Sequence, residues 1–483
     1  MDKPNILWIC TDQQRYDTLG CSGNKYVQTP NIDRLAANGV LFENAFCQAT
    51  VCTPSRASFL TGRYPRTTRC RQNGQNIPED EVLVTRLLAD IGYTVGLSGK
   101  LHISACDPDV ASAGERRIND GYHQIHWSHH PENSWPTNEY IQWLGSKGKI
   151  FKPLPNQGSV YVQTGPDAED HQTTWCAEKA IQFIEANKHF SKPWLFSVNM
   201  FDPHHPFDPP KDYLKRYLEK LDEIPLPNYK ERELETKTSV QRFDHHGAYG
   251  KPDFYPYSQM TNRDHRMLKA AYWAMIDLID EQVGRIIEAL ERTGQLNNTI
   301  IIFMSDHGEL LGDHGIYLKG PFFYESSVRV PLIVSYPGHF GINQHVTQLV
   351  ELVDIAPTLL EAAGLHKHPG MQGKSLWKLL TEDTDARSES HRDNVYCEHY
   401  NASSKQDGVG SFATMVRTEQ YKLVMYHQKS EAELYDLLAD PNESINLWNR
   451  SEASSIQMKM LVQLCDRMAE TVDPLPQRLS QWY

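Results

Sequence analysis

The sequence predicts an α/β fold in which a mixed, mostly parallel β-sheet lies between helices, followed by a smaller C-terminal antiparallel α+β subdomain. Two observations predict the sheet: short apolar, β-branched segments recur along the chain, and helical patterns alternate with them. Continuous apolar segments are typical of parallel strands buried on both faces, and strand–helix alternation is typical of α/β sheets. A third observation is that the alternation stops near residue 370, where shorter strand patterns begin.

The strands expected in the main sheet are buried and parallel, and they cover residues 5–10, 93–98, 194–200, 299–305 and 331–335. One helix is expected to begin at Pro30, with Thr29 as its cap and Gly39 as its terminator. Two more are expected over residues 176–187 and 263–293.

Beyond residue 370, short antiparallel strands are expected at residues 394–399, 413–417 and 421–426, and a helix at 455–470. We therefore expect a catalytic α/β domain over residues 1–370 and an α+β subdomain over residues 371–483. Two long segments without clear periodicity, 104–170 and 209–262, are expected to build a binding surface, because long loops on a rigid sheet usually do so.

Composition excludes several classes of protein. The 483 residues carry a formal net charge of −13, which argues against a nucleic-acid partner. No apolar run is long enough to span a membrane, and the first residues do not form a signal peptide. A cytoplasmic protein is expected from the sequence as written, and a periplasmic or secreted one if a signal peptide has been removed. The nine cysteines form no CxxC pair, which disfavours a disulfide framework or a zinc ribbon. The composition is compatible with either a monomer or an oligomer.

Polar residues follow four of the expected strands. Asp12 and Gln13 follow the first, Lys100 and His102 the second, His204 and His205 the third, and Asp306 and His307 the fourth. Because ligands bind beyond the carboxyl ends of the strands in open α/β sheets, these side chains are expected to meet at one edge. Asp12, Gln13, Asp306 and His307 are the metal-ligand candidates: oxygen ligands suit Ca²⁺ or Mg²⁺, and an imidazole leaves Mn²⁺ open.

Cys52 is expected just before the start of a helix, with Thr53 as the cap, Pro54 as the first residue and Gly62 as the terminator. A helix N-terminus stabilises negative charge, and Arg56 adds a fixed cation one turn on. Both features point to an anionic ester as the substrate.

The segment Cys52-Thr53-Pro54-Ser55-Arg56, followed by Thr61-Gly62-Arg63, resembles the signature of the sulfatase family, which has the alkaline-phosphatase-like fold. Further matches follow the family's order at residues 4–7, 29–35, 99–102, 203–207, 305–308 with Lys319, 329–332 and 433–437.

The resemblance implies that a formylglycine-generating enzyme oxidises Cys52 to formylglycine, whose hydrated form attacks sulfur beside a divalent cation. It implies metal ligation by Asp12, Gln13, Asp306 and His307, with residue 52 contributing a hydroxyl. It places Arg56, Lys100 and Lys319 around the sulfate, His102 at the second hydroxyl of the nucleophile, and His204 as the proton donor to the leaving alcohol. His205 is the weaker candidate for that donor, because one histidine of the pair can equally pack or cap a turn.

Two residues depart from the commonest family pattern. Gln13 stands where many sulfatases have a second Asp, and His307 stands where they have Asn. This combination is also similar to that of phosphonate monoester hydrolases, so hydrolysis of phosphonate monoesters or phosphodiesters is the alternative function. Our first hypothesis is hydrolysis of a small-molecule or oligosaccharide sulfate ester with Ca²⁺ as cofactor, Mn²⁺ and Mg²⁺ being the alternatives. A binding protein without activity is disfavoured, because it needs no nucleophile, cations and proton donor together.

Overall fold

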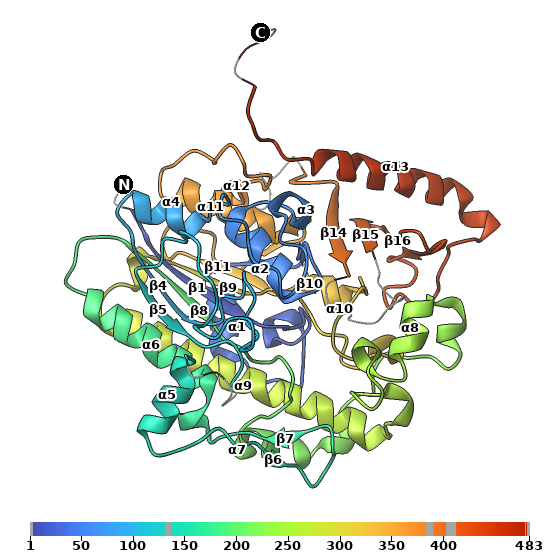
Figure 1. The fold of residues 1–483 in the computed structure, drawn as a ribbon, viewed down its shortest axis with the longest axis horizontal. Coiled ribbons are helices and arrows are strands. Elements are labelled where there is room, and N and C mark those ends of the chain that lie inside the picture. The colour runs from blue at the N-terminus through green and yellow to red at the C-terminus, as the bar shows by residue number, and fades with distance from the viewer. Residues whose placement is uncertain are drawn as a thin grey trace.

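The computed structural model describes residues 3–131, 135, 137–382, 390–401, 412–478 and 480; Met1 and Asp2, on which the signal-peptide expectation partly depends, lie outside them. Within these residues the centre of the molecule is an eight-stranded mixed sheet (Figure 1). Its strands are β1 (Asn5–Thr11), β2 (Val40–Phe42), β4 (Thr94–Gly99), β5 (Gln124–Trp127), β8 (Trp194–Asn199), β9 (Thr299–Ser305), β11 (Leu332–Ser335) and β12 (Gln344–Val346). They lie side by side in the order β12-β2-β11-β9-β1-β8-β4-β5.

Four of the five predicted strands are parallel neighbours, as expected: β9, β1, β8 and β4. The fifth prediction was wrong in direction, because β11 pairs antiparallel with both β9 and β2. A parallel return needs a crossover that carries the chain back to the starting edge, usually through a helix. Between β9 and β11 the chain forms α10 (Glu325–Val328), which is too short for such a crossover, and β11 therefore runs back beside β9.

Helices cover both faces of the sheet because side chains of successive strand residues point to opposite faces. In β1, Ile6 and Trp8 pack in one core cluster and Leu7 and Ile9 in the other. The first cluster includes residues of α2 (Cys52–Thr61), α4 (Val84–Asp90), α11 (Ile355–Ala362) and α12 (Trp377–Thr381). The second includes residues of α1 (Pro30–Ala37), α5 (Glu139–Ser146), α6 (Gln172–Asn187), α7 (Lys211–Leu218) and α9 (Asn262–Arg292), and Figure 1 shows the two layers on opposite sides of the sheet.

The predicted helices form with small shifts at their ends. α1 begins at Pro30 after Thr29, as expected. It ends at Ala37 with Asn38 as its C-cap, so Gly39 does not terminate it. Gly39 instead allows a close approach to β11, because a Cβ there would lie 2.6 Å from the carbonyl oxygen of Val334. The predicted helices 176–187 and 263–293 correspond to α6 and α9.

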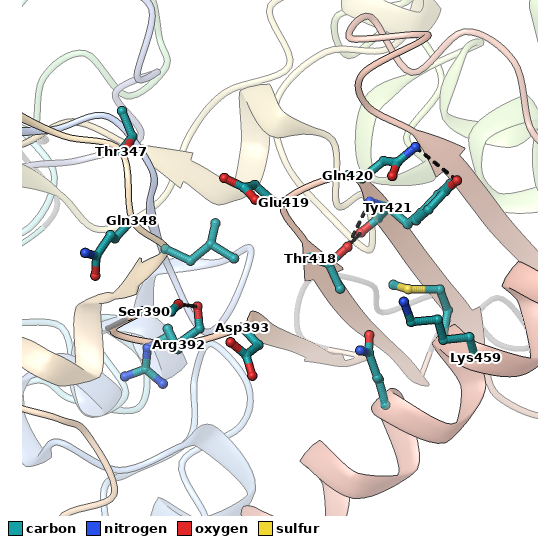
Figure 2. A pocket seen from close by; sticks show the side chains of 13 residues that line it. Thr347, Gln348, Ser390, Arg392, Asp393, Thr418, Glu419, Gln420, Tyr421 and Lys459 are labelled. Carbon is teal, nitrogen blue, oxygen red and sulfur yellow. Dashed lines mark hydrogen bonds between the residues drawn. The ribbon is translucent and has the colours of Figure 1, made fainter. Parts of the chain in front are cut away.

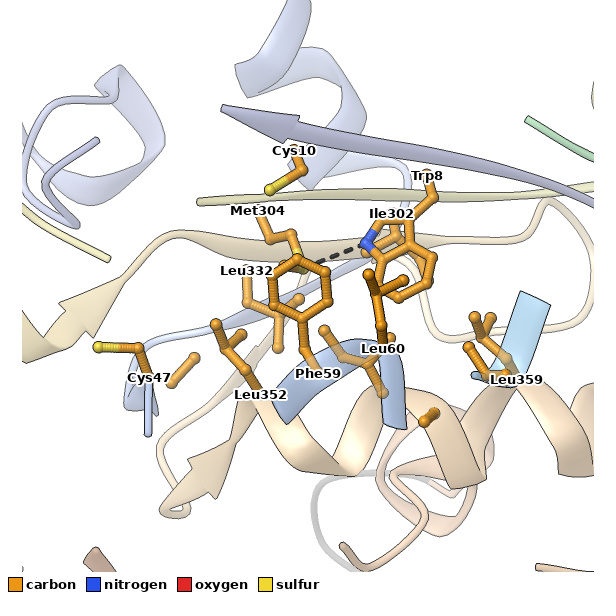
Figure 3. Close-up of a cluster of buried hydrophobic side chains, with 14 of the residues drawn as sticks. Trp8, Cys10, Cys47, Phe59, Leu60, Ile302, Met304, Leu332, Leu352 and Leu359 are labelled. Atoms are coloured by element: carbon orange, nitrogen blue, oxygen red, sulfur yellow. Dashed lines mark hydrogen bonds between the residues drawn. The ribbon is translucent and has the colours of Figure 1, made fainter. Parts of the chain in front are cut away.

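One buried contact fixes the position of α2 on the sheet (Figure 3). The ring of Phe59, from α2, packs against Trp8 of β1, with 5.4 Å between the ring centroids. The Trp8 indole Nε1–H in turn donates to Met304 Sδ of β9 at 3.2 Å. The helix that carries Cys52 is therefore packed against the two central strands that carry Asp12 and Asp306 at their ends.

A second, antiparallel sheet follows residue 370. Its strands among the described residues are β14 (Asn394–Tyr400), β15 (Phe412–Thr418), β16 (Tyr421–Tyr426) and β17 (Glu431–Asp436). Met460 and Leu464 of α13 (Ser454–Glu470) pack with Val416 and Leu423 of this sheet. The three predicted strands and the helix are confirmed, whereas β17 was not predicted.

The remaining described elements are short. The small strands are β3 (Ala45–Phe46), β10 (Arg329–Val330) and β13 (Val350–Glu351), which form one sheet, and β6 (Leu154–Pro155) and β7 (Gln163–Thr164), which form another. The short helices are α3 (Pro65–Thr68) and α8 (Ser239–Asp244). In the part of the chain that the structure describes, no helix has both the length and the apolarity to cross a bilayer.

Candidate active site

The polar residues that follow the parallel strands meet at one edge of the sheet. β9, β1, β8 and β4 are consecutive neighbours and run in the same direction, so their carboxyl ends are adjacent. Backbone hydrogen bonds continue past the strand ends: the Asp306 N–H donates to the Thr11 carbonyl at 3.3 Å, and the Lys100 N–H to the Asn199 carbonyl at 2.9 Å. The backbone therefore places Asp12, Lys100, His204 and Asp306 around a common centre.

Cys52 is the first residue of α2, and the residue is 1% exposed. The predicted cap was wrong: Val51, in an extended conformation, is the N-cap, and the Thr53 hydroxyl makes no hydrogen bond among the described residues. The backbone N–H of Thr53 has no acceptor within the helix and donates instead to the side-chain carbonyl of Asn73 at 3.0 Å. A cap supplied from another segment therefore replaces the one expected from Thr53, and Gly62 ends the helix with φ of +68°, as predicted.

The Cys52 thiol lies among charged groups. Lys319 Nζ is 2.9 Å from Sγ, His307 Nε2 is 3.2 Å away and Asp12 Oδ1 is 3.6 Å away. Burial and Asp12 raise the pKa of Cys52, but Lys100, Lys319 and His307 outweigh them and lower it to about 7. Negative charge at residue 52 is therefore stabilised.

Cys52 is one of four potential metal ligands that lie together. Ligand atoms of Asp12, Cys52, Asp306 and His307 all lie within 4.8 Å of one another, and all four side chains are buried. The His307 Nδ1–H faces the Gly308 carbonyl at 2.9 Å, so Nε2 is the ring nitrogen that faces the cluster. Burial lowers the pKa of His307, but Asp306 and Cys52 raise it to about 9, so Nε2 must lose its proton to bind a cation.

Gln13 adds a further oxygen. Its Nε2–H donates to the Glu309 carboxylate, while its buried Oε1 has no hydrogen-bond partner in the described part of the chain. Two carboxylates, an amide oxygen and an imidazole suit a divalent cation of the Ca²⁺, Mg²⁺ or Mn²⁺ type. The residues present therefore fit such an ion.

Arg56 and Lys100 contact the carboxylates of this cluster. Arg56 Nε donates to Asp306 Oδ2 at 2.8 Å, and its Nη2 lies 3.6 Å from Asp12 Oδ2. Lys100 Nζ donates to Asp12 Oδ2. Burial raises the pKa of Asp12, but Lys100, Lys319 and Arg56 hold it well below its usual range. These cations keep the Asp12 carboxylate ionised, and Lys319 is the cation beside the thiol.

A cavity of about 570 Å³ opens above Cys52. Lys100, His102, His204 and Lys319, predicted from the sequence, line it together with His205. The structure thus brings every predicted catalytic residue except Arg56 to the cavity wall, and Arg56 lies behind it with the carboxylates.

Other residues of the wall were not predicted. They are Gln72, Asn73, His129, His130, Phe201, Tyr249, Lys251 and Asn401. His129 and His130 follow β5, a strand of four partly polar residues that the periodicity did not reveal. Had β5 been recognised, the same inspection of strand ends would have included this His pair. Tyr249 and Lys251 come from the segment 209–262, which contributes to the cavity as expected.

Four imidazoles of the wall favour their neutral form. Burial lowers the pKa of His102, His129, His204 and His205 well below 6.5, and nearby lysines add to the effect. His204 Nδ1 faces the His205 carbonyl at 2.5 Å, so in the neutral ring Nδ1 carries the proton and Nε2 the lone pair. The imidazoles can therefore accept protons in a pocket that contains Lys100 and Lys319.

A second cavity, of about 500 Å³, lies between the antiparallel sheet and the loops beside the main sheet (Figure 2). Its described wall contains no histidine or cysteine, and its Arg392 is paired with Glu351 and Asp354. It lacks the nucleophile and the ligand cluster found at Cys52. The chemistry therefore belongs to the cavity above Cys52.

Comparison with known proteins identifies the family of the chain. A family model described as sulfatase matches residues 4–365, and one described as the C-terminal part of N-sulphoglucosamine sulphohydrolase matches residues 312–470. An arylsulfatase of Clostridium perfringens is 31% identical over 470 residues, which cover 93% of this chain and 91% of the relative. An N-acetylglucosamine-6-O-sulfatase of Bacteroides thetaiotaomicron is 26% identical, with 96% of this chain and 86% of the relative covered.

The solved structure of a phosphonate monoester hydrolase of Agrobacterium radiobacter superimposes with a TM-score of 0.81 at 26% identity, covering 99% of this chain and 98% of that one. The mixed, mostly parallel sheet between helices, with its C-terminal antiparallel sheet, is the alkaline-phosphatase-like fold. The sulfatase family model matches residues 4–365, which are most of the chain. The chain therefore belongs to the sulfatase family and is a sulfuric ester hydrolase.

Proposed function

We propose that the chain hydrolyses sulfate monoesters to an alcohol and inorganic sulfate, with Cys52, converted to formylglycine, as the nucleophile. The observation that carries the proposal is the surrounding of Cys52 Sγ: Lys319 Nζ at 2.9 Å, His307 Nε2 at 3.2 Å and Asp12 Oδ1 at 3.6 Å, in a buried site at the base of the cavity. Eight other cysteines lack this environment in the described structure, and burial raises the pKa of most of them.

We propose Asp12, Gln13, Asp306 and His307 as ligands of one divalent cation, with residue 52 completing the set. Ca²⁺ is the first choice because three of the four side chains offer oxygen, and Mn²⁺ and Mg²⁺ are the alternatives. A bound cation supplies Lewis acidity at the side chain of residue 52. The unpartnered Oε1 of Gln13 supports its place among the ligands.

Positive charge is available where negative charge develops during the reaction. Lys319 lies beside the reacting side chain, and Lys100 lies on the cavity wall. Preorganised cations in a water-poor site stabilise a transition state more strongly than they would in water. Arg56 acts one layer behind, where it holds Asp306 and Asp12 in the position of ligands.

We assign His204 as the proton donor to the leaving alcohol. Burial, Lys319 and His205 lower its pKa, so the ring is neutral before substrate binds and its Nε2 has no proton to give. An anionic ester in the cavity adds negative charge beside the ring and favours the imidazolium form. Substrate binding therefore prepares the acid, and His102 is left to accept the proton of the second hydroxyl of residue 52.

The substrate class is a small-molecule or oligosaccharide sulfate ester. One relative is named as an N-acetylglucosamine-6-O-sulfatase, and the cavity of about 570 Å³ has the volume of small-molecule sites. The net charge of −13 disfavours a long polyanionic chain. Hydrolysis of phosphonate monoesters or phosphodiesters is the second candidate, favoured by the ligands Gln13 and His307 and by the similarity to a phosphonate monoester hydrolase.

The test compares initial rates on an aryl sulfate and an aryl phosphonate, each with Ca²⁺ and with Mn²⁺. The aryl sulfate is expected to be hydrolysed faster, and Cys52→Ala is expected to remove activity on both substrates while the protein stays folded. A dominant phosphonate rate would make the second candidate the function. Mass spectrometry of the peptide that contains residue 52 tests the oxidation separately, because an unmodified thiol in fully active enzyme contradicts the proposed nucleophile.

A further inference from the structure

A second group of metal-type ligands lies next to the catalytic cavity. His102 and His129 line the cavity, and Cys106 joins them: one ligand atom from each of the three lies within 4.8 Å of the others. The two imidazole rings meet edge to face, with 4.3 Å between their centroids. The proposed cation site uses none of these three side chains.

The nitrogens of this group lack partners. His102 Nδ1 and both ring nitrogens of His129 are buried and make no hydrogen bond to any described residue. Each buried polar atom left in this way costs on the order of 1–3 kcal/mol, and most buried polar atoms in folded proteins are paired. Three such atoms in one group are available to a ligand that enters from the cavity.

We propose that His102, Cys106 and His129 form a second metal site, for Zn²⁺ or a similar transition metal, and that its occupation stops turnover. A thiolate and two imidazoles are the ligands that Zn²⁺ prefers, whereas the oxygen-rich site at Asp12 and Asp306 suits harder cations. In tetrahedral zinc sites the ligand atoms lie about 3.3–3.6 Å apart, and the three ligand atoms here lie within 4.8 Å of one another, so small side-chain movements bring them to zinc distances.

The surroundings of Cys106 favour a closed site. Its side chain packs with Trp127 and Trp135, which exclude water on that side. The thiol lies 3.2 Å from the Ser104 carbonyl oxygen, to which it donates. Metal binding replaces the thiol proton, which leaves to solvent, and the thiolate charge offsets part of the charge of the ion.

The group is held by a rigid backbone. Glu115 accepts the N–H groups of His102 and Ser104 at 2.8 and 3.0 Å, and also the indole N–H of Trp127 at 3.1 Å. Its carboxylate thereby links the segment that carries His102 and Cys106 to the strand that precedes His129. The backbone that carries the three ligands is therefore held in place before a metal arrives, and only the side chains have to move.

Occupation of this site would remove His102 from catalysis. A metal on Nδ1 of a neutral imidazole leaves the proton on Nε2, so the ring can no longer accept one. Zn²⁺ is therefore expected to inhibit without displacing the catalytic cation. Metal binding itself does not depend on the proposed function, and it can be measured without any substrate.

The binding test uses Co²⁺ as a spectroscopic substitute for Zn²⁺ in a Cys52→Ala background, which removes the thiol of the first site. The expected result is a thiolate-to-cobalt absorption band that Zn²⁺ abolishes and that is absent from Cys106→Ser. Cys465→Ser, at an exposed cysteine of α13, is the matched control and is expected to keep the band. If thermal melting shows that Cys106→Ser is unfolded, His129→Gln is tested in its place, and the band is expected to be absent from it. A band that survives loss of the Cys106 thiol or of the His129 ring overturns the site.

The inhibition test uses the active enzyme, with Cys52 intact. Zn²⁺ is expected to inhibit the wild type and Cys465→Ser alike, and the inhibiting concentration is expected to rise at least about tenfold in Cys106→Ser, whose rate without Zn²⁺ is unchanged. Equal inhibition of all three proteins overturns the link to catalysis. If the protein binds cobalt at this site but hydrolyses no sulfate ester, the proposed function is wrong and the metal site stands. If it hydrolyses the ester but binds no cobalt here, the metal site is wrong and the proposed function stands.

Discussion

The Glu115 carboxylate holds the backbone of His102: its Oε2 accepts the His102 N–H at 2.8 Å. Its Oε1 accepts the next two N–H groups, of Ile103 at 2.5 Å and Ser104 at 3.0 Å. His102 has φ of +54°, a left-handed conformation that costs free energy for a residue with a Cβ. Both carboxylate oxygens therefore help to hold His102 in an unfavourable backbone conformation.

We predict that Glu115→Gln lowers kcat by about 10–100-fold with a smaller change in KM, the range typical of residues that orient a catalytic group. An amide has only one oxygen. Its NH₂ group must therefore face backbone N–H groups whose hydrogen bonds the carboxylate accepted, so that donor faces donor. Steady-state kinetics on the preferred ester measures the effect, with thermal melting to confirm folding. Glu79→Gln, at an exposed Glu paired with Arg116, is the control and should behave as wild type. An unchanged kcat in folded Glu115→Gln would show that the carboxylate does not position His102.

We predict that Gln13→Ala weakens cation binding at least about tenfold, because it removes the buried Oε1 assigned to the ion. Isothermal titration calorimetry of the metal-free enzyme with Ca²⁺ measures the dissociation constant directly. Gln28→Ala, at an exposed glutamine, provides the comparison. If Gln13→Ala binds Ca²⁺ as tightly as the wild type, the amide is not a ligand and only holds Glu309.

Phe59→Ala is expected to lower the free energy of unfolding by about 3–5 kcal/mol, the usual cost of removing a buried aromatic ring. Phe59 packs on Trp8 between α2 and the central strands, and the cavity left behind loosens the helix that carries Cys52. Urea denaturation measures the loss. Phe190→Ala, at a ring that is 68% exposed, should change stability by less than about 0.5 kcal/mol. A loss at Phe59 no larger than this would show that α2 is held by other contacts.

His399 gives a prediction about pH. Burial lowers its pKa to about 3, below the value near 6.5 of an unfolded histidine. As the pH falls below 6.5 the unfolded chain takes up this proton first, so the contribution of His399 to stability is present at neutral pH and is lost towards acid pH. Between pH 7.5 and pH 5 the wild type loses about 2 kcal/mol through this residue.

His399→Asn is therefore expected to reduce the acid-induced loss of stability by about 2 kcal/mol, measured as the difference between urea unfolding at the two pH values. His366→Asn, at an exposed histidine, serves as the reference and should leave the pH dependence unchanged. Identical pH profiles for wild type and His399→Asn would mean that His399 is protonated as readily in the folded as in the unfolded protein.

Five of the eight strands of the main sheet could be predicted because continuous apolar segments are needed where both faces are buried, whereas β2 and β12, of three residues each, and β5 were not predicted. Residues 5–10 and 299–305 illustrate this, and the structure extends or matches them as β1 and β9. The direction of β11 could not be predicted, since hydrophobicity does not encode whether a strand runs parallel or antiparallel. β5 escaped because its exposed Gln124 and half-buried Ile125 and His126 interrupt the apolar pattern.

The site was predictable where its residues follow predicted strands, as Asp12, Lys100 and Asp306 do. Contacts between distant segments were not predictable. Asn73, 20 residues from Thr53, caps the helix start, and this bond depends on how the chain folds back. Glu115 could not be identified either, because a lone Glu in an irregular segment has no pattern that reveals three backbone donors around it.

The depth of Cys52 has a consequence for how active protein is made. The residue is 1% exposed, and every residue of α2 is buried. If Cys52 is converted to formylglycine, as proposed above, the oxidising enzyme has to bind the surrounding chain before it folds into a packed helix, so we expect the oxidation during synthesis, ahead of folding. The fraction of active molecules then depends on the rate of oxidation relative to the rate of folding. Slower folding at low temperature should raise the formylglycine content found by mass spectrometry, and protein that folded first should stay inactive however stable it is.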